Sequence, residues 1–182
     1  MISGCICFLL PDLIHDTQTG FVQDRNILDN IFTFSEATEW AQHNGQHLGV
    51  LLDFEKAYDR VDWSFLEGML LRLGFLEAWI KGIASLYRSA SSRVIIEGRM
   101  GERFTLEHSV RQGCPLAPYL FLFFAEAMAH FLRAHTTRLR GMRLPIRDET
   151  EILDLEYADN TALYVQDDVE SLEGAKDRKS VV

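Results

Sequence analysis

The chain is poor in cysteine and proline, and both shortages narrow the class of protein. Its 182 residues include three cysteines, Cys5, Cys7 and Cys114. An odd number with this spacing fits neither a disulfide framework nor a zinc site. We expect reduced thiols in an intracellular protein, with nucleus and cytoplasm not distinguished. The chain has only four prolines, no low-complexity linker and no internal repeat, and its 11% aromatic residues argue against disorder of the whole chain.

Long apolar segments are also missing. The first ten residues are apolar, but no basic residue precedes them, and Pro11 and Asp12 follow at once. This stretch is too short to span a bilayer and lacks the charged start of a signal peptide. We therefore expect a protein that is neither secreted nor associated with a membrane.

Basic residues are outnumbered by acidic ones. Lys and Arg total 18, Asp and Glu total 27, and the formal net charge is −9 at pH 7. Free-standing nucleic-acid binders usually carry a basic surface, so the acidic excess argues against that class. It does not exclude a polymerase fragment, because a metal site rich in carboxylates adds negative charge. Hydrophobic residues make up 47% of the chain, enough for the core of one globular domain.

The apolar patterns predict an α+β fold in which helices pack on an antiparallel-rich sheet. The strand expected at 48–53 shows no clean alternation, so we expect both of its faces to be covered. The helix expected at 77–87 should turn Ile80, Ile83, Leu86 and Tyr87 inward. The expected helices are 27–40, 62–73, 77–87, 118–130 and a polar one at 169–179, and the expected strands are 48–53, 93–97, 102–106, 141–146, 152–157 and 161–165.

Two aspartates stand at the ends of predicted strands. Asp53 closes the strand 48–53, and Asp159 lies in the tight turn between 152–157 and 161–165. Two carboxylates from distant strands could meet around divalent metal, as two-metal nucleotidyl transfer requires. Each aspartate alone has an ordinary explanation as a turn residue.

Further candidates surround these aspartates in sequence. Tyr58 follows Asp53 by five residues, where an aromatic ring could stack under an incoming sugar, or could simply belong to the core. In the loop at 111–118, Gly113 permits close approach of a ligand to the backbone, and Gln112 can both donate and accept hydrogen bonds. An ordinary loop that opens a helix near Pro118 explains the same residues.

Four blocks of sequence occur in a characteristic order. They are QTGF at 18–21 with Arg25 and DNI at 29–31, LDFEKAYDRV at 52–61, VRQGCPLAPYLF at 110–121, and YAD at 157–159. Together they resemble the reverse transcriptases of non-LTR (LINE-type) retrotransposons. The similarity runs from about residue 10 to 165, so we expect residues 1–182 to form a single partial domain, with 1–9 atypical and 166–182 a truncated tail.

This resemblance implies a right-hand polymerase palm with part of the fingers and no thumb. The implied chemistry is RNA-directed DNA polymerisation by a two-metal mechanism with Mg²⁺, using an RNA template, a DNA primer and dNTPs. Asp53 and Asp159 correspond to the catalytic metal ligands. Tyr58 corresponds to the aromatic residue that discriminates between sugars.

The same resemblance assigns roles to residues outside the strands. Arg111, Gln112, Gly113 and Pro115 correspond to the loop that positions nucleotide and template. Arg25 falls in the fingers-side block, where it would approach phosphate or template.

One position departs from the family pattern. The family carries two adjacent aspartates in the turn, whereas this chain has Asp159 followed by Asn160. An amide oxygen can ligate a metal but brings no charge, and two divalent ions held close together repel by on the order of several kcal/mol at low effective dielectric. We therefore expect Asn160 to be a degenerate catalytic position that weakens metal binding and lowers the rate.

Three functions remain open on these grounds. The favoured one is a degenerate retroelement fragment with little or no activity, supported by Asn160, the atypical start and the early end. The first alternative is an active RNA-directed DNA polymerase that needs a partner or the missing thumb. The second is a non-catalytic interaction module that reuses the palm. The sequence does not indicate an oligomeric state.

Overall fold

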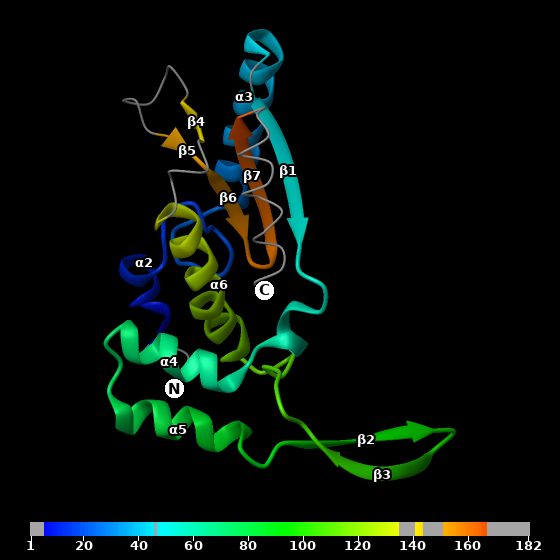
Figure 1. The fold of residues 1–182 in the computed structure, drawn as a ribbon. Coiled ribbons are helices and arrows are strands. Elements are labelled where there is room, and N and C mark those ends of the chain that lie inside the picture. Colours follow the sequence, from blue (N-terminus) through cyan, green and yellow to red (C-terminus); the bar gives the residue numbers. More distant parts are fainter. Residues whose placement is uncertain (1–5, 46, 135–140, 144–150, 167–182) are drawn as a thin grey trace. The chain divides into compact units, whose positions relative to one another are not determined.

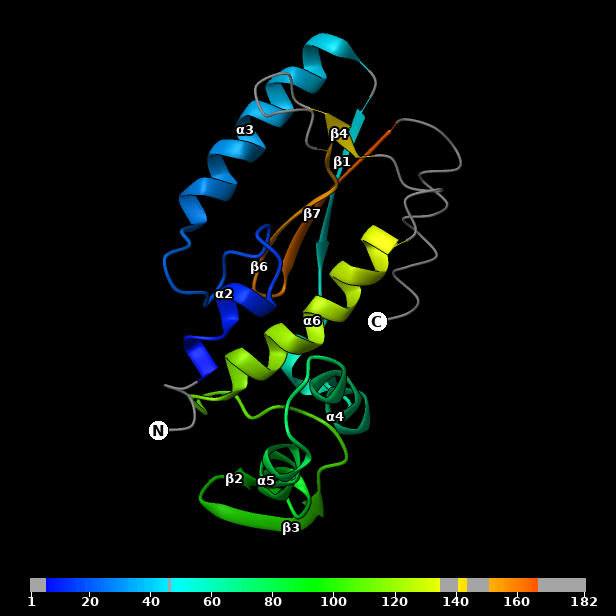
Figure 2. The ribbon, with the colours of Figure 1, turned by 90° about the vertical axis from the view of Figure 1, so that its left-hand side faces the viewer.

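The computed structural model describes residues 6–45, 47–134, 141–143 and 151–166. The chain divides into two compact units (Figures 1 and 2). We call Met1–Glu55 with Ala125–Val182 the sheet unit, and Lys56–Phe124 the helical unit. No helix in the described part of the chain combines the length and apolar character that a membrane crossing requires.

A three-stranded antiparallel sheet is the centre of the sheet unit. Its order is β1-β7-β6, with β1 at His47–Asp53, β6 at Asp154–Tyr157 and β7 at Asn160–Gln166. β1 pairs with β7 along its whole length. A separate two-stranded sheet joins β4 (Met142–Arg143) to β5 (Glu151–Ile152).

Two helices cover opposite faces of this sheet. Ala37 of α3 (Ile27–Asn44) packs with Tyr164 and Leu155, whereas Leu132 of α6 (Ala117–Ala134) packs with Leu163. Tyr164 and Leu163 are consecutive residues of β7, so their side chains point to opposite faces. Figure 2 shows α3 and the second half of α6 on the two sides of the strands.

Both ends of α3 follow from its sequence. The side chain of its N-cap Asn26 accepts a hydrogen bond from the backbone N–H of Leu28 at 3.1 Å. The helix ends at Gly45, whose φ of 63° is a left-handed conformation that glycine adopts readily. A short helix that the sequence did not predict, α2 (Leu10–Leu13), precedes α3.

The helical unit contains a helix pair and an exposed hairpin. The pair is α4 (Trp63–Arg72) and α5 (Glu77–Tyr87), preceded by the 3-10 turn η1 (Ala57–Arg60). The hairpin joins β2 (Ser91–Ile96) to β3 (Arg99–Thr105).

The predicted α+β class with an antiparallel sheet is confirmed, and several local expectations need correction. Leu86 is 57% exposed, because the buried stripe of α5 runs through Ile80, Ile83 and Tyr87. Leu51 of β1 is 73% exposed, so the prediction that both faces of this strand are covered is wrong. The reason is a hollow of about 300 Å³ between this end of β1 and α3.

Some predicted boundaries shifted and others cannot be compared. The β2–β3 turn is tighter than expected, because only Glu97 and Gly98 separate the strands. The expected strand 152–157 is broken at Leu153, which lies between β5 and β6. Residues 144–146 of the expected strand 141–146 and the expected helix 169–179 lie outside the described residues.

Candidate active site

Asp53 and Asn160 face each other at one end of the sheet. They form the last register pair between β1 and β7, as the last residue of β1 and the first of β7. Directly opposed residues in an antiparallel pair have their Cβ atoms about 4.5–5.5 Å apart. Both side chains are exposed. The structure therefore joins a carboxylate and an amide that are 107 residues apart in the chain (160 − 53 = 107).

Asp159 lies next to this pair in the turn that joins β6 to β7. Tyr157 pairs with Asn160, so only Ala158 and Asp159 make the turn. Ala158 has a φ of 54°, a left-handed conformation that is uncommon for a residue with a Cβ. Asp159 is half-buried. The sequence predicts a tight acidic turn at 158–160, and the structure shortens it by one residue because Asn160 already pairs with Tyr157.

The carboxylates of Asp53 and Asp159 are available to an external cation. Neither makes a hydrogen bond or ion pair with any other residue that the structure describes. The same part of the chain holds no group of three or more His, Cys, Asp or Glu side chains arranged to bind a metal. The donor set at this end of the sheet is thus two carboxylates and the Asn160 amide oxygen.

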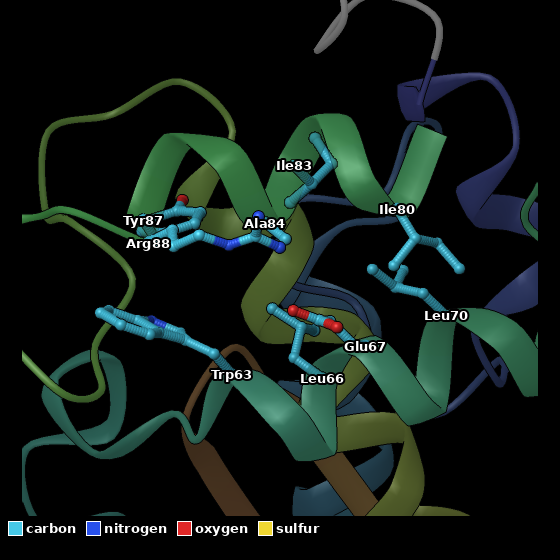
Figure 3. Close-up of a pocket in the computed structure, with 9 residues that line it drawn as sticks. All are labelled: Trp63, Leu66, Glu67, Leu70, Ile80, Ile83, Ala84, Tyr87 and Arg88. Carbon is cyan, nitrogen blue, oxygen red and sulfur yellow. The ribbon is translucent and has the colours of Figure 1, made fainter. Parts of the chain in front are cut away.

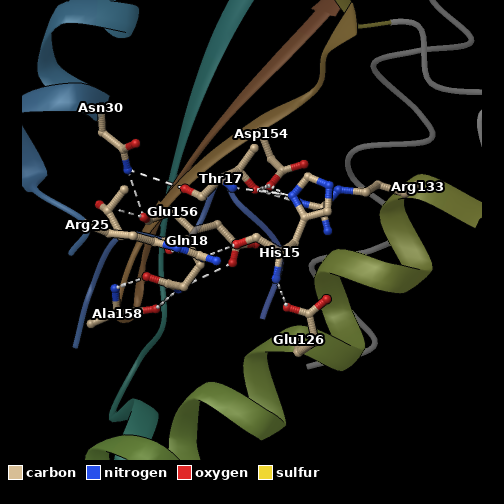
Figure 4. A network of polar contacts seen from close by, with 11 residues as sticks. His15, Thr17, Gln18, Arg25, Asn30, Glu126, Arg133, Asp154, Glu156 and Ala158 are labelled. Atoms are coloured by element: carbon tan, nitrogen blue, oxygen red, sulfur yellow. Dashed lines mark hydrogen bonds and ion pairs between the residues drawn. The ribbon is translucent and has the colours of Figure 1, made fainter. Parts of the chain in front are cut away.

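A buried polar cluster lies behind the turn (Figure 4). Arg133 of α6 donates from Nη2 to Oδ2 of Asp154 at 2.6 Å, and Thr17 donates from Oγ1 to the same oxygen at 2.8 Å. The Asp154 side chain is 1% exposed and that of Arg133 is 23% exposed. This ion pair ties the second half of α6 to β6.

Glu156, two residues along β6, is the most perturbed acid in the cluster. Burial, together with the nearby charge of Asp154, raises the pKa of the Glu156 carboxyl to about 8. Burial also raises the pKa of Glu126 on α6 and lowers that of His15, whose backbone N–H donates to Glu126 Oε2 at 3.0 Å. Carboxyls taken out of water favour their neutral form.

Arg25 is held inside the sheet unit. Its Nη1 donates to the carbonyl oxygens of His15 at 2.6 Å and Gln18 at 2.9 Å. Its Nη2 donates to the carbonyls of Pro11 and Ile14 at 3.1 and 3.0 Å and forms an ion pair with Asp16. These contacts make Arg25 an organiser of the segment before α3, and its predicted approach to phosphate or template stays a prediction.

Tyr58 and the loop after β3 belong to the helical unit. The Tyr58 ring stacks on Phe121 with centroids 5.0 Å apart and 21° between planes. Its carbonyl oxygen accepts a hydrogen bond from the backbone N–H of Val110 at 2.8 Å, and that of Val61 accepts from Ser109 at 2.9 Å. These two backbone contacts place the start of the loop at 111–115 beside Tyr58.

The loop itself is a tight exposed turn. The N–H of Cys114 donates to the carbonyl of Arg111 at 3.1 Å, and Gly113 has a φ of 83°. A left-handed third position of this kind is typical of a type II turn and favours glycine. The side chains of Arg111 and Gln112, like Gly113 and Pro115, are exposed. Within the helical unit, the predicted loop residues therefore stand together next to Tyr58.

A separate small pocket lies between α4 and α5 (Figure 3). It has a volume of about 150 Å³. Trp63, Leu66, Ile80 and Ile83 contribute to its mainly apolar wall, and Tyr87 closes one side. Burial raises the pKa of the Tyr87 hydroxyl to about 12. None of the residues predicted from the sequence as site residues lines this pocket.

Sequence reasoning missed the polar cluster that supports the turn. Gln18, Asp154 and Glu156 are buried, although none was assigned a role. A signal was present, since Asp154 and Glu156 alternate with apolar residues and Gln18 belongs to the QTGF block. Polar residues on the inward face of a strand usually mean a built hydrogen-bond network.

An antiparallel sheet between helices, with aspartates at one end, is the arrangement of a polymerase palm. Residues 5–179 match the family described as reverse transcriptase (RNA-dependent DNA polymerase). The chain belongs to this family. The predicted resemblance to non-LTR retrotransposon reverse transcriptases is confirmed by this match and by a transposon relative.

That relative is the "Transposon TX1 uncharacterized 149 kDa protein" of Xenopus laevis. The two sequences are 34% identical over 174 residues, which cover 95% of this chain and 13% of the relative. The chain thus spans about an eighth of the length of this curated relative.

Solved telomerase structures share the fold. A telomerase from Candida albicans, solved with a fragment of telomeric RNA, matches with a TM-score of 0.60 and 13% identity, over 98% of this chain and 32% of that one. An apo telomerase from Candida tropicalis gives 0.59 and 16%, over 98% and 35%. At these identities the likeness concerns the fold alone.

Proposed function

We propose that Asp53 and Asp159 form the metal-binding centre of a template-directed nucleotidyl transfer site whose activity is little or none, because Asn160 replaces a carboxylate. The observation that carries this proposal is the register pair of Asp53 with Asn160, next to the turn that presents Asp159. The polymerase family supplies the reaction class.

The three oxygen donors, from Asp53, Asp159 and Asn160, suit a divalent ion but offset less of its charge than three carboxylates would. Reverse transcriptases as a family use divalent metal ions, and Mg²⁺ prefers oxygen ligands from one or two carboxylates, water and substrate phosphates. Asp53 and Asp159 would hold the ion, with Asn160 as a neutral oxygen donor. When bound, the ion would neutralise charge that develops on the reacting phosphate. Two ions at this centre would be held weakly, since only two carboxylates offset their charge.

The other predicted residues would bind and orient the substrates. By family resemblance these substrates are dNTPs, a DNA primer and an RNA template. Tyr58 would discriminate between sugars. Arg111, Gln112, Gly113 and Pro115 would position nucleotide and template. An intracellular location without membrane association is part of the same proposal.

Full polymerase activity is the alternative function. An amide oxygen is a legitimate ligand for a hard cation, so Asn160 could complete the coordination without adding charge. The two functions differ in the activity of the natural chain, and primer extension separates them.

The test is primer extension on an RNA template with Mg²⁺, comparing the natural chain with Asn160→Asp. This third carboxylate should raise the rate by at least about tenfold, which corresponds to about 1.4 kcal/mol of the activation barrier. Asp53→Ala in each background is the control, because extension that survives this change comes from another source.

Efficient extension by the natural chain that Asp53→Ala abolishes would contradict low activity and establish the alternative. If Asn160→Asp extends no better than the natural chain, the lost carboxylate is not the limiting feature. The proposal predicts extension by Asn160→Asp and little or none by the natural chain.

A further inference from the structure

The side-chain amide of Gln18 forms hydrogen bonds with the backbone of the turn that carries Asp159. Gln18 is 1% exposed. Its Oε1 accepts hydrogen bonds from the N–H of Ala158 at 2.8 Å and of Gly20 at 2.9 Å. Its Nε2 donates to the carbonyl oxygen of Ala158 at 3.1 Å and to Oε2 of Glu156 at 3.3 Å. Figure 4 shows Gln18 reaching from the segment before α3 to Ala158.

These partners determine how the amide is oriented. Two backbone N–H groups meet one end of it, and two oxygen acceptors meet the other. An inverted amide would set its NH₂ group against the N–H groups of Ala158 and Gly20. The Gln18 amide thus pairs with both the N–H and the carbonyl of Ala158, as a residue on a neighbouring antiparallel strand would.

The turn is in a conformation that needs such support. Ala158 has a φ of 54°, which costs free energy for a residue with a Cβ and persists where the surroundings impose it. The hydrogen bonds between Gln18 and Ala158 require their two segments to lie very close together. A Cβ added at Gly20 would overlap the backbone nitrogen of Ala158. Glycine at position 20 therefore lets the two segments meet.

The segment that carries Gln18 is itself fixed to β6. The N–H of Glu156 donates to the carbonyl of Thr17 at 2.9 Å, and the N–H of Thr19 donates to the carbonyl of Glu156 at 3.0 Å. Asn30 of α3 adds a hydrogen bond to the same Glu156 carbonyl at 2.8 Å. Arg25 binds the Gln18 carbonyl from the other side, at 2.9 Å. Hydrogen bonds thus hold the backbone on both sides of Gln18.

We propose that Gln18 is a positioning residue that fixes the Ala158 turn and thereby sets the Asp159 carboxylate for metal binding. This inference rests on the proposed function, because it assigns Gln18 a role at the same centre. Residues that orient the ligands of a metal commonly change its affinity without touching it.

The test measures Mn²⁺ binding by electron paramagnetic resonance, which reports free and bound ion without requiring catalysis. Gln18→Met keeps the length of the side chain and removes all four hydrogen bonds of the Gln18 amide. We expect its Mn²⁺ dissociation constant to rise roughly tenfold, the low end of the effect of outer-shell changes. Gln23→Met, an exposed glutamine in the same segment, is the matched control and should bind as the natural chain does.

Two more variants separate positioning from stability and define the site. Asn26→Ala removes the N-cap of α3, a side chain that bonds Leu28 and not Gln18, so it should lower the melting temperature and leave Mn²⁺ affinity unchanged. Asp53→Ala should abolish Mn²⁺ binding. If Asp53→Ala binds Mn²⁺ like the natural chain, the proposed metal centre is wrong, and the role of Gln18 falls with it. If Asp53→Ala loses the ion while Gln18→Met keeps full affinity, only the Gln18 inference is overturned.

Amide hydrogen exchange tests the inference on the natural chain, so no variant has to fold. The Ala158 amide should exchange with solvent at least about tenfold more slowly than in an unstructured peptide, because its N–H is bonded to a buried acceptor. Exchange of Ala158 at the unprotected rate would also overturn the inference.

Discussion

Two hairpins in the described part of the chain, β6–β7 and β2–β3, have similar two-residue turns and different surroundings. β6 and β7 join through Ala158 and Asp159, and β2 and β3 join through Glu97 and Gly98. Both turns hold a non-glycine residue at positive φ, 54° at Ala158 and 49° at Glu97. Yet β6 is buried from residue 154 to 156, whereas β3 is exposed along its whole length.

The two turns are held in place by different kinds of contact. In the β2–β3 hairpin, Arg103 donates to Ser91 at 2.6 Å across the exposed strand pair, and both side chains belong to the hairpin itself. In the β6–β7 hairpin, the turn is held from outside by Gln18, and its strand is anchored to α6 through Arg133. The β6–β7 turn is therefore supported by buried polar contacts from outside the hairpin, whereas the β2–β3 hairpin contributes its own exposed contact.

The largest expected effect comes from the ion pair at the base of β6. Arg133→Met leaves the buried Asp154 carboxylate without its cation, so we expect a loss of about 3–5 kcal/mol in the free energy of unfolding. The matched change in the other hairpin, Arg103→Met, removes an exposed contact and should cost within about 0.5 kcal/mol. Urea denaturation of both variants measures these losses. Equal losses would abolish the contrast between the hairpins.

A smaller effect is expected from the buried acid on the same strand. The pKa of Glu156 is raised from 4.5 to about 8, so the folded protein binds a proton that the unfolded chain releases between these values. The stability contributed by this group is present at low pH and is lost as the pH rises from about 4.5 to about 8. The lowered pKa of His15 acts in the opposite sense, because its stability is lost as the pH falls.

Glu156→Gln separates the contribution of Glu156 to the pH dependence of stability from that of His15. The variant keeps an oxygen that can accept from Gln18 and carries no titrating group, so at pH 8 it should be more stable than the natural chain by more than about 1 kcal/mol. At pH 5 the difference should shrink. Glu102→Gln, on exposed β3, is the matched control in the other hairpin. Parallel pH profiles for the natural chain and Glu156→Gln would contradict burial as the cause of the raised pKa.

Local signals predicted the helices more accurately than the polar support of the site. The expected helix 77–87 coincides with α5, and the expected helix 62–73 begins at Asp62, the N-cap of α4, whose side chain accepts from the N–H of Phe65 at 2.7 Å. Such signals act within a few residues. Gln18 and Ala158 are 140 residues apart, so no local pattern shows that they meet.

The aspartates were predictable for a different reason. Asp53 and Asp159 stand at strand ends that apolar runs mark clearly, and antiparallel pairing brings those ends together. The exposure of Leu51 and Leu86 was not predictable in this way, because it depends on how closely a neighbouring element packs. Periodicity identifies an apolar face, and tertiary packing decides how far that face is covered.

We propose that Asp53 and Asp159 bind metal weakly because position 160 carries no charge. Isothermal titration of Mg²⁺ into the natural chain and into Asn160→Asp tests this proposal. An added carboxylate about 4 Å from a divalent ion is worth more than about 1.4 kcal/mol, so Asn160→Asp should bind at least about tenfold more tightly. Equal Mg²⁺ affinity of the two chains would show that the missing charge at position 160 does not weaken metal binding.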